Sequence, residues 1–130
     1  MYKRQVNQHL AGIHIASAAE AIVFAIGQGI EPAKALEVIS RCAGTSWMFE
    51  NRVPHIVAGD YTPLSAVDIF VKDLGIVLDT AAQAGFTPTL AQTAAEAFRA
   101  AQDAGLGRED DSAVAKIFAE RAGVALPGAD

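Results

Sequence analysis

Apolar residues recur at helical spacing along almost the whole chain. One stripe starts at Val6 and continues by threes and fours, and the segment 6–28 is apolar on most of its other faces as well. A long helix that is apolar nearly all round is buried on several sides. No segment alternates as a half-buried strand would. The pattern therefore predicts an all-α fold of about six helices, with one long N-terminal helix.

Breaker residues place the next two helices. Gly29 ends the long helix, and Pro32 suits the first turn of a helix over residues 33–42. A short helix is expected over residues 47–53, because Pro54 follows it and Thr45 or Ser46 can serve as its cap.

Three further helices are expected downstream, over residues 65–84, 87–104 and 111–122. Ser65, with Asp68 three residues later, resembles a capping pair at the start of the first of them. Asp111 or Ser112 can cap the last. The intervening stretches are rich in glycine, proline and polar residues, which is typical of loops.

Composition and charge narrow the class of protein. The chain has 130 residues and is 52% apolar, enough for one domain with a real core and too much for a disordered chain. Its formal net charge is −5, with acidic and basic residues scattered. Phosphate binding needs a concentrated basic face, so nucleic acid is not an expected partner.

The cysteine and histidine residues are too few and too scattered to form a disulfide or a metal site. Cys42 is the single cysteine, which excludes an intramolecular disulfide. His9, His14 and His55 show no metal-ligand spacing, so no protein-only metal site is expected. The longest apolar run is far shorter than the roughly 20 residues that span a bilayer, and no secretion signal is recognisable. We therefore expect no membrane partner and a cytoplasmic location.

Motifs for a self-contained active site are missing. The sequence has no GxGxxG or GxxxxGK[ST] loop for a nucleotide phosphate and no GxSxG nucleophile elbow. From the residues alone, the chain is a helical domain without a self-contained active site.

Lys72 interrupts an otherwise strongly apolar run, "DIFVKDLGIVLD". On a helix it shares a stripe with Asp68, Gly75 and Asp79. One interpretation is an exposed ion pair with Asp68, worth a few tenths of a kcal/mol. The other is contact with a ligand, which Gly75 favours: a mid-helix glycine costs ~1 kcal/mol against alanine and suggests that something packs closely there.

Two other segments carry polar groups at unusual places. Asn7 and Gln8 open the long apolar helix, either as ordinary N-terminal polarity or as ligands for a substrate carboxylate or hydroxyl. The segment "SWMFENR", residues 46–52, concentrates aromatic and polar residues near predicted loops, and its simplest interpretation is a capped core helix with a flanking ion pair.

These segments together resemble a known family. The motifs "HLAGIHIASAAEA", "AGTSWMFENR", "GDYTPLSAVDIFVKDLG" and "GREDDSAVAKIF" are similar, in order from about Val6 to Phe118, to the C-terminal helical domain of the beta-hydroxyacid dehydrogenases. This is the group of 3-hydroxyisobutyrate dehydrogenase, with the helical fold of 6-phosphogluconate dehydrogenase-like enzymes. The "SWMFENR" segment is the more subgroup-specific signal and points to four-carbon sugar acids such as threonate.

The resemblance implies an enzyme that oxidises a small hydroxy acid with NAD or NADP. In the family, an N-terminal Rossmann domain carries most of the dinucleotide, and the helical domain closes the cleft and often forms homo-oligomers. Lys72 matches the family lysine beside the nicotinamide and is thus a cofactor-binding candidate. Asn7 and Gln8 match the amide positions of the catalytic KxxN motif, which implies that both bind substrate and that Asn7 orients it.

One position departs from the family pattern. Arg4 stands where the KxxN motif has its catalytic lysine, and arginine stays protonated and cannot exchange a proton with a hydroxyl. The opening "MYKRQ" resembles translated sequencing adapter, so we expect residues 1–5 to be a non-native leader. Residues 6–122 would then be the helical dehydrogenase domain and 123–130 a tail, without the Rossmann domain.

Two functions from different classes therefore stay open. The first is a fragment of an NAD(P)-dependent hydroxyacid dehydrogenase, inactive by itself. The alternative is a free-standing, non-catalytic helical module for dimerisation or binding.

Overall fold

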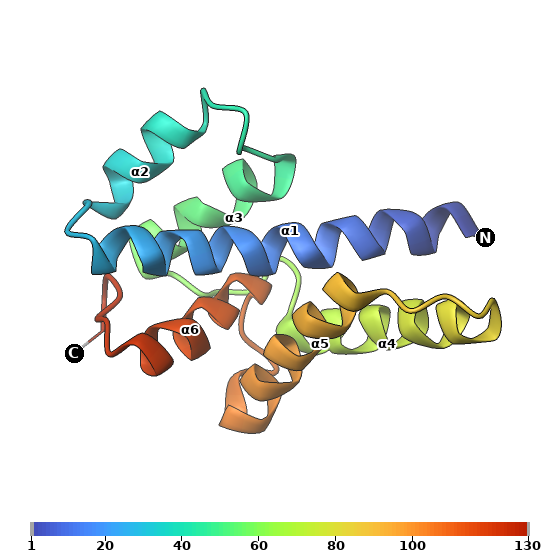
Figure 1. Cartoon of the computed structure of the whole chain (residues 1–130). Coiled ribbons are helices and arrows are strands. Elements are labelled where there is room, and N and C mark those ends of the chain that lie inside the picture. Colours follow the sequence, from blue (N-terminus) through green and yellow to red (C-terminus); the bar gives the residue numbers. More distant parts are fainter. Residues whose placement is uncertain (1, 130) are drawn as a thin grey trace.

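The computed structural model describes residues 2–129 and is built of helices joined by short loops (Figure 1). The helices are α1 (Tyr2–Gly27), α2 (Pro32–Ile39), α3 (Trp47–Ala58), α4 (Val67–Gln83), α5 (Thr89–Ala101) and α6 (Ala115–Ala122). A turn of π-helix, Gln102–Leu106, follows α5, and a turn of 3₁₀-helix, Asp111–Val114, precedes α6. No strand forms among the described residues. The predicted all-α architecture with one long first helix is confirmed.

Helix α1 is the axis of the core. It contacts every other helix, with α2 and α3 along one side and α4, α5 and α6 along the other (Figure 1). Its buried residues include Ile15, Ala19 and Ile22, each 1% exposed. Alanines on these faces let neighbouring helices approach closely, and the expectation of burial on several sides is confirmed. The two ends keep large apolar side chains in solvent, Val6 at 62% and Phe24 at 69% exposure.

By length and composition alone, α1 could also cross a membrane. Within residues 2–129 it is the one helix that passes this test, and 44% of its most apolar window is buried inside the protein. The core helix of a soluble protein passes the same test. The packing of α1 against five helices accounts for its apolar character without a bilayer.

Three helix ends differ from the sequence expectation, and one of them is α5, which ends at Ala101 and not at residue 104 because a π-helical turn follows. Helix α3 does not stop at Pro54 but runs to Ala58, with the proline inside it. The prediction was wrong because Val53 and Ile56 on the same helix are fully buried, and their burial outweighs the lost backbone hydrogen bond. Helix α2 ends at Ile39, earlier than residue 42, and Cys42 is exposed.

The expected caps downstream were also wrong in detail. Helix α4 begins at Val67, with no side-chain cap; the N–H groups of Val67 and Asp68 instead donate to the carbonyls of Glu109 and Gly107, both at 2.9 Å. The last helical segment begins at Asp111, and its cap is Asp110, whose side chain accepts from the N–H of Ser112. The Asp110 cap is local, whereas the acceptors for the first turn of α4 come from a segment about 40 residues away, which no local pattern encodes.

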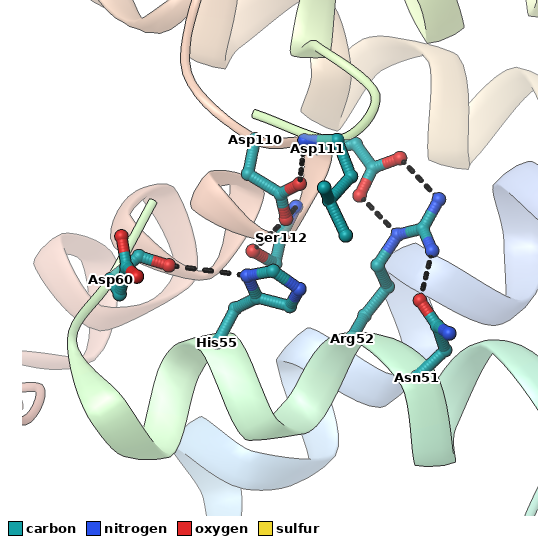
Figure 2. Close-up of polar contacts among 8 residues, drawn as sticks. Asn51, Arg52, His55, Asp60, Asp110, Asp111 and Ser112 are labelled. Atoms are coloured by element: carbon teal, nitrogen blue, oxygen red, sulfur yellow. Dashed lines mark hydrogen bonds and ion pairs between the residues drawn. The ribbon is translucent and has the colours of Figure 1, made fainter. Parts of the chain in front are cut away.

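A buried polar network ties α3 to the turn before α6. Arg52 Nε donates to Asp111 Oδ1 at 2.7 Å, and Nη2 donates to Oδ2 at 3.1 Å (Figure 2). Arg52 Nη1 donates to the side chain of Asn51. Asp111 is 0% exposed, and burial raises its pKa, although the guanidinium opposes part of that rise. The two-point geometry fixes the helix against the turn as well as neutralising the buried charge.

The neighbouring carboxylate, Asp110, holds the loop before α4. It accepts from the N–H of Leu64 and of Ser112, both at 3.1 Å, and from the Ser112 hydroxyl (Figure 2). Its own N–H donates to the carbonyl of Tyr61 at 2.9 Å. Burial, followed by the charges of Glu109 and Asp110, raises the pKa of Tyr61 to about 12.

Truncation of Arg52 tests this network. We expect Arg52→Ala to lower the free energy of unfolding by ~3–5 kcal/mol, because it leaves the Asp111 carboxylate buried without its partner. Urea denaturation measures the effect. The control is Lys34→Ala, which removes only an exposed i,i+3 pair with Glu37 and should change stability by ~0.5 kcal/mol or less. An Arg52→Ala protein within ~1 kcal/mol of wild type would show that the buried pair does not anchor the fold.

The Tyr61 phenol gives a pH-dependent test. In ultraviolet titration, one of the two tyrosines should ionise only near pH 12, and Tyr61→Phe should abolish that late step. Folded Tyr61 keeps its proton above pH 10.0, where an unfolded tyrosine releases it. Stability should therefore fall as the pH rises from 10 towards 12, by up to about 1.4 kcal/mol per pH unit. A late step that survives in Tyr61→Phe would contradict the assignment.

Candidate functional site

The candidate site lies beside a close contact between α1 and α4. At Gly12 a Cβ atom would lie 2.8 Å from Leu74 Cδ2, closer than real Cβ contacts allow. Leu74 is 0% exposed, so the contact is part of the packed core. Glycine at this position lets the two backbones come together. One turn before Gly12 lies Gln8, and directly before Leu74 lies Asp73.

A small surface cavity of about 220 Å³ opens beside this contact. It is lined by Arg4, Gln5, Gln8, Lys72, Asp73 and Ile76. The structure thus brings together three positions singled out in the sequence, Arg4 and Gln8 from α1 and Lys72 from α4. Asn7 does not line the cavity and is exposed, but it is joined to Gln8 by a hydrogen bond.

The amides and a carboxylate form a relay between the two helices. Asn7 Nδ2 donates to Gln8 Oε1 at 2.9 Å, and Gln8 Nε2 donates to Asp73 Oδ2 at 2.8 Å. Asp73 was not predicted as a site residue. Its one signal in the sequence is its place directly after Lys72, which does not reveal that it faces Gln8.

Lys72 makes no ion pair. Within residues 2–129 the ion pairs are Lys34–Glu37, Arg52–Asp111 and Lys116–Glu109. Asp68, the expected partner, instead accepts from Gln102 Nε2 at 2.8 Å and lies against Gly107. The ion-pair interpretation of Lys72 was therefore wrong: tertiary contacts hold Asp68 elsewhere.

Gly75 shows no close neighbour of its own. A Cβ atom there would meet nothing within 4 Å among the described residues. The packing that its place in mid-helix suggested is therefore not supplied by this chain. The bare backbone lies one turn from Lys72, on the same exposed stripe.

The cavity suits a small anionic or polar group. Arg4 and Lys72 contribute two cations, and the single acid on its wall, Asp73, is already hydrogen-bonded to Gln8. Gln5 Oε1 is buried without a hydrogen-bond partner, so the wall also holds an unused acceptor. At about 220 Å³ the cavity is below the range of roughly 300–1,000 Å³ that whole ligands occupy. Its residues fit a small acid or the nicotinamide end of a dinucleotide, not a complete dinucleotide.

Three larger cavities lie elsewhere and hold none of the predicted site residues: two grooves along α1 and a cavity of about 380 Å³ beside α6. One groove of about 650 Å³ runs between α1, α5 and α6, and one of about 590 Å³ between α1, α2 and α3. Both are mainly apolar and share Phe24 and Ser17 on their common border. Size alone would favour these grooves, but the charged and amide groups converge at the small cavity, so we assign the candidate site there. No cluster of metal-ligating residues exists in the described chain.

The "SWMFENR" segment has a structural explanation. Ser46 caps α3 by accepting from the N–H of Phe49 at 2.9 Å, and Arg52 is in the buried ion pair. Its partner Asp111 lies 59 residues away rather than in the flanking sequence. Trp47 stays 70% exposed and takes no part in the cavity.

Known proteins match nearly the whole chain. A family model described as "NAD-binding of NADP-dependent 3-hydroxyisobutyrate dehydrogenase" matches residues 3–118. An L-threonate dehydrogenase from Cupriavidus necator is 58% identical over 123 residues, and one from Haemophilus influenzae is 57% identical over 122. These stretches cover 95% and 94% of this chain but 40% of each relative, so the chain spans well under half of their length.

A solved structure agrees with the sequence matches. The crystal structure of a 3-hydroxyisobutyrate dehydrogenase from Salmonella typhimurium superposes with a TM-score of 0.88 at 55% identity. The alignment covers 89% of this chain and 41% of that one.

Proposed function

The chain belongs to the NADP-dependent 3-hydroxyisobutyrate dehydrogenase family, and from that premise we propose that it is the helical C-terminal part of a dehydrogenase for a small hydroxy acid. A four-carbon sugar acid such as threonate is the proposed substrate, because several relatives of more than 50% identity are named L-threonate dehydrogenase. The remaining part, with most of the NAD or NADP site, would be a nucleotide-binding domain upstream, which this chain does not contain.

One observation carries the proposal: Arg4, Gln8 and Lys72 line a single cavity between α1 and α4. Gln8 and Lys72 are 64 residues apart in the sequence, and neither side chain is needed to fill the core. Lys72 is exposed, has no ion pair with any residue from 2 to 129, and lies beside a bare stretch of helix at Gly75. An unpaired cation and an open backbone at one place are what a docking cofactor would require.

The proposed role of each site residue follows from the chemistry of its side chain. Asn7 and Gln8 would bind the substrate by hydrogen bonds, with Asn7 orienting the hydroxyl that is oxidised. Lys72 would lie against the nicotinamide end of the cofactor and contribute a fixed positive charge in a cleft from which water is excluded. The nicotinamide, when bound, accepts the hydride, and the protein supplies orientation and a proton acceptor.

The proton acceptor is the part that this chain lacks. Arg4 lines the cavity at the place of the family's catalytic lysine, but a guanidinium does not release its proton near neutral pH. We propose that residues 1–5 are a non-native leader and that the natural protein has the lysine there. The observation that favours the second candidate, a non-catalytic helical module, is this same arginine if it is native.

Lys72→Ala in a complete parent protein tests the proposed role. We expect a loss of several kcal/mol of transition-state stabilisation, seen as a fall in kcat/KM of at least ~100-fold. Stability should change by ~0.5 kcal/mol or less, because the side chain is exposed and unpaired. Lys72→Arg should recover activity only in part, since it keeps the charge but changes its shape.

Two comparisons complete that experiment. Lys34→Ala, on the outer helix α2, should leave both properties unchanged, and the isolated 130-residue chain should transfer no hydride from any hydroxy acid. Near-normal kinetics for Lys72→Ala would reduce this lysine to a surface charge. Hydride transfer by the isolated chain would show that no upstream domain is needed.

We also propose that the helical domain self-associates. The chain exposes 7429 Å², roughly 800 Å² more than the about 6,600 Å² typical of a folded monomer of its mass. A standard interface covers about 800 Å² on each partner. The exposed apolar residues Phe24, Ile30 and Val38 border one groove on α1, and Phe24 and Leu90 border the other. This surface is the proposed contact between copies.

Phe24→Glu should weaken self-association at least tenfold in sedimentation velocity. A carboxylate placed at the border of both grooves would have to be desolvated in the interface, which costs several kcal/mol. The fold should survive, since Phe24 is 69% exposed. Glu31→Gln, at an exposed position outside both grooves, is the matched control. A wild-type chain that stays monomeric at high concentration would refute self-association.

A further inference from the structure

We propose that Asp73 is a positioning residue, which acts through Gln8 to aim the side chain of Asn7 at the substrate hydroxyl. This inference rests on the proposed function and gives a role to a residue that lies within a quoted family motif but to which neither the resemblance nor the comparisons assign one. The observation behind it is the relay from Asn7 through Gln8 to Asp73, which crosses from α1 to α4 at the edge of the cavity.

The direction of the relay follows from the chemistry of its last member. An ionised carboxylate can only accept hydrogen bonds, so Asp73 requires the NH₂ end of the Gln8 amide to face α4. Gln8 Oε1 must then point the other way, towards Asn7, where it accepts from Nδ2 at 2.9 Å. One charge on α4 therefore sets the orientation of two amides on α1.

The orientation of Asn7 has a functional consequence. With Nδ2 committed to Gln8, its carbonyl oxygen, Oδ1, is left without a partner among residues 2–129. An amide oxygen accepts a hydrogen bond from a hydroxyl, whereas the opposite orientation would present an NH₂ group. The relay thus presents an acceptor to a substrate that carries a hydroxyl, which is the group to be oxidised in the proposed reaction.

Electrostatics argue that Asp73 has such a role. Its negative charge shares the cavity wall with Arg4 and Lys72 and opposes the binding of an acid there. The core does not need it either, because the fully buried neighbour Leu74 makes the close contact with Gly12. The one hydrogen bond of its side chain within residues 2–129 goes to Gln8. A carboxylate that weakens anion binding and fills no core space is explained by the amide that it orients.

The test compares variants of a complete parent protein. Asp73→Asn keeps the shape but lets the Gln8 amide adopt either orientation, so kcat should fall at least ~10-fold, while KM and the melting temperature change little. Gln8→Glu alone places two carboxylates together and should reduce kcat by ~100-fold. Combined with Asp73→Asn, it should recover at least ~10-fold, because the introduced amide can donate to the introduced carboxylate, which still accepts from Asn7.

The control is Asp79→Asn, an exposed carboxylate on α4 outside the cavity, which should leave kcat and KM unchanged. A double variant no more active than Gln8→Glu, or Asp73→Asn with normal kcat, would overturn the positioning role while leaving the proposed function intact. If the unmodified parent oxidises no hydroxy acid, the proposed function itself fails. A purely structural role would instead lower the melting temperature in step with kcat, and the double variant would not recover.

Discussion

The close approach of α1 and α4 at Gly12 is the constraint on which the candidate site depends. Any larger side chain there would have to displace Leu74, which is fully buried. The contact sets the separation of the two helices, and a hydrogen bond between Gln8 and Asp73 is possible only at that separation. The cavity is thus a by-product of helix packing: the polar groups occupy the first turn beyond the point where the backbones meet.

Charged side chains hold α3 to the turn before α6, whereas the contact between α1 and α4 depends on the glycine at position 12. Arg52 and Asp111 join α3 to the turn before α6. Asp110 holds the loop before α4, because its carboxylate accepts from the N–H of Leu64 and its own N–H donates to the carbonyl of Tyr61. A buried pair with two parallel hydrogen bonds tolerates little rotation, so these segments form a rigid base. Rigidity there fixes α4, because the N–H groups of its first turn bond to carbonyls in the segment before Asp110. The site therefore rests on a base formed by residues that do not line it.

The sequence predicted the fold well where local signals are strong. Six helices and the long central α1 follow from apolar period and glycine, and these were right. Of the two candidate caps of α3, Thr45 and Ser46, the structure uses Ser46. The errors occurred where tertiary contacts outweigh local preference. Pro54 lies inside a helix because Val53 and Ile56 are buried on either side of it.

The site shows the same division. Lys72 and Gln8 were recognisable from the sequence as out of place, and they do come together in one cavity. Their partners were not recognisable: the Asp68–Lys72 pair does not form, and Asp73 bonds to an amide 65 residues away. Contacts at such separation depend on how helices cross, and a single sequence does not contain that information in readable form.

Because α1 is continuous, the number of residues between Gln8 and Gly12 determines where the Gln8 side chain lies. Gly12 and Gln8 lie on one unbroken helix, so each residue between them advances the backbone by about 100° and 1.5 Å. A single inserted or deleted residue in this stretch would leave the composition almost unchanged, yet it would turn Gln8 about a quarter of a revolution away from α4. Residue identities between the two positions are far less restricted than their number. In this part of the molecule, the number of residues between Gln8 and Gly12 sets both the distance and the angle between their side-chain positions.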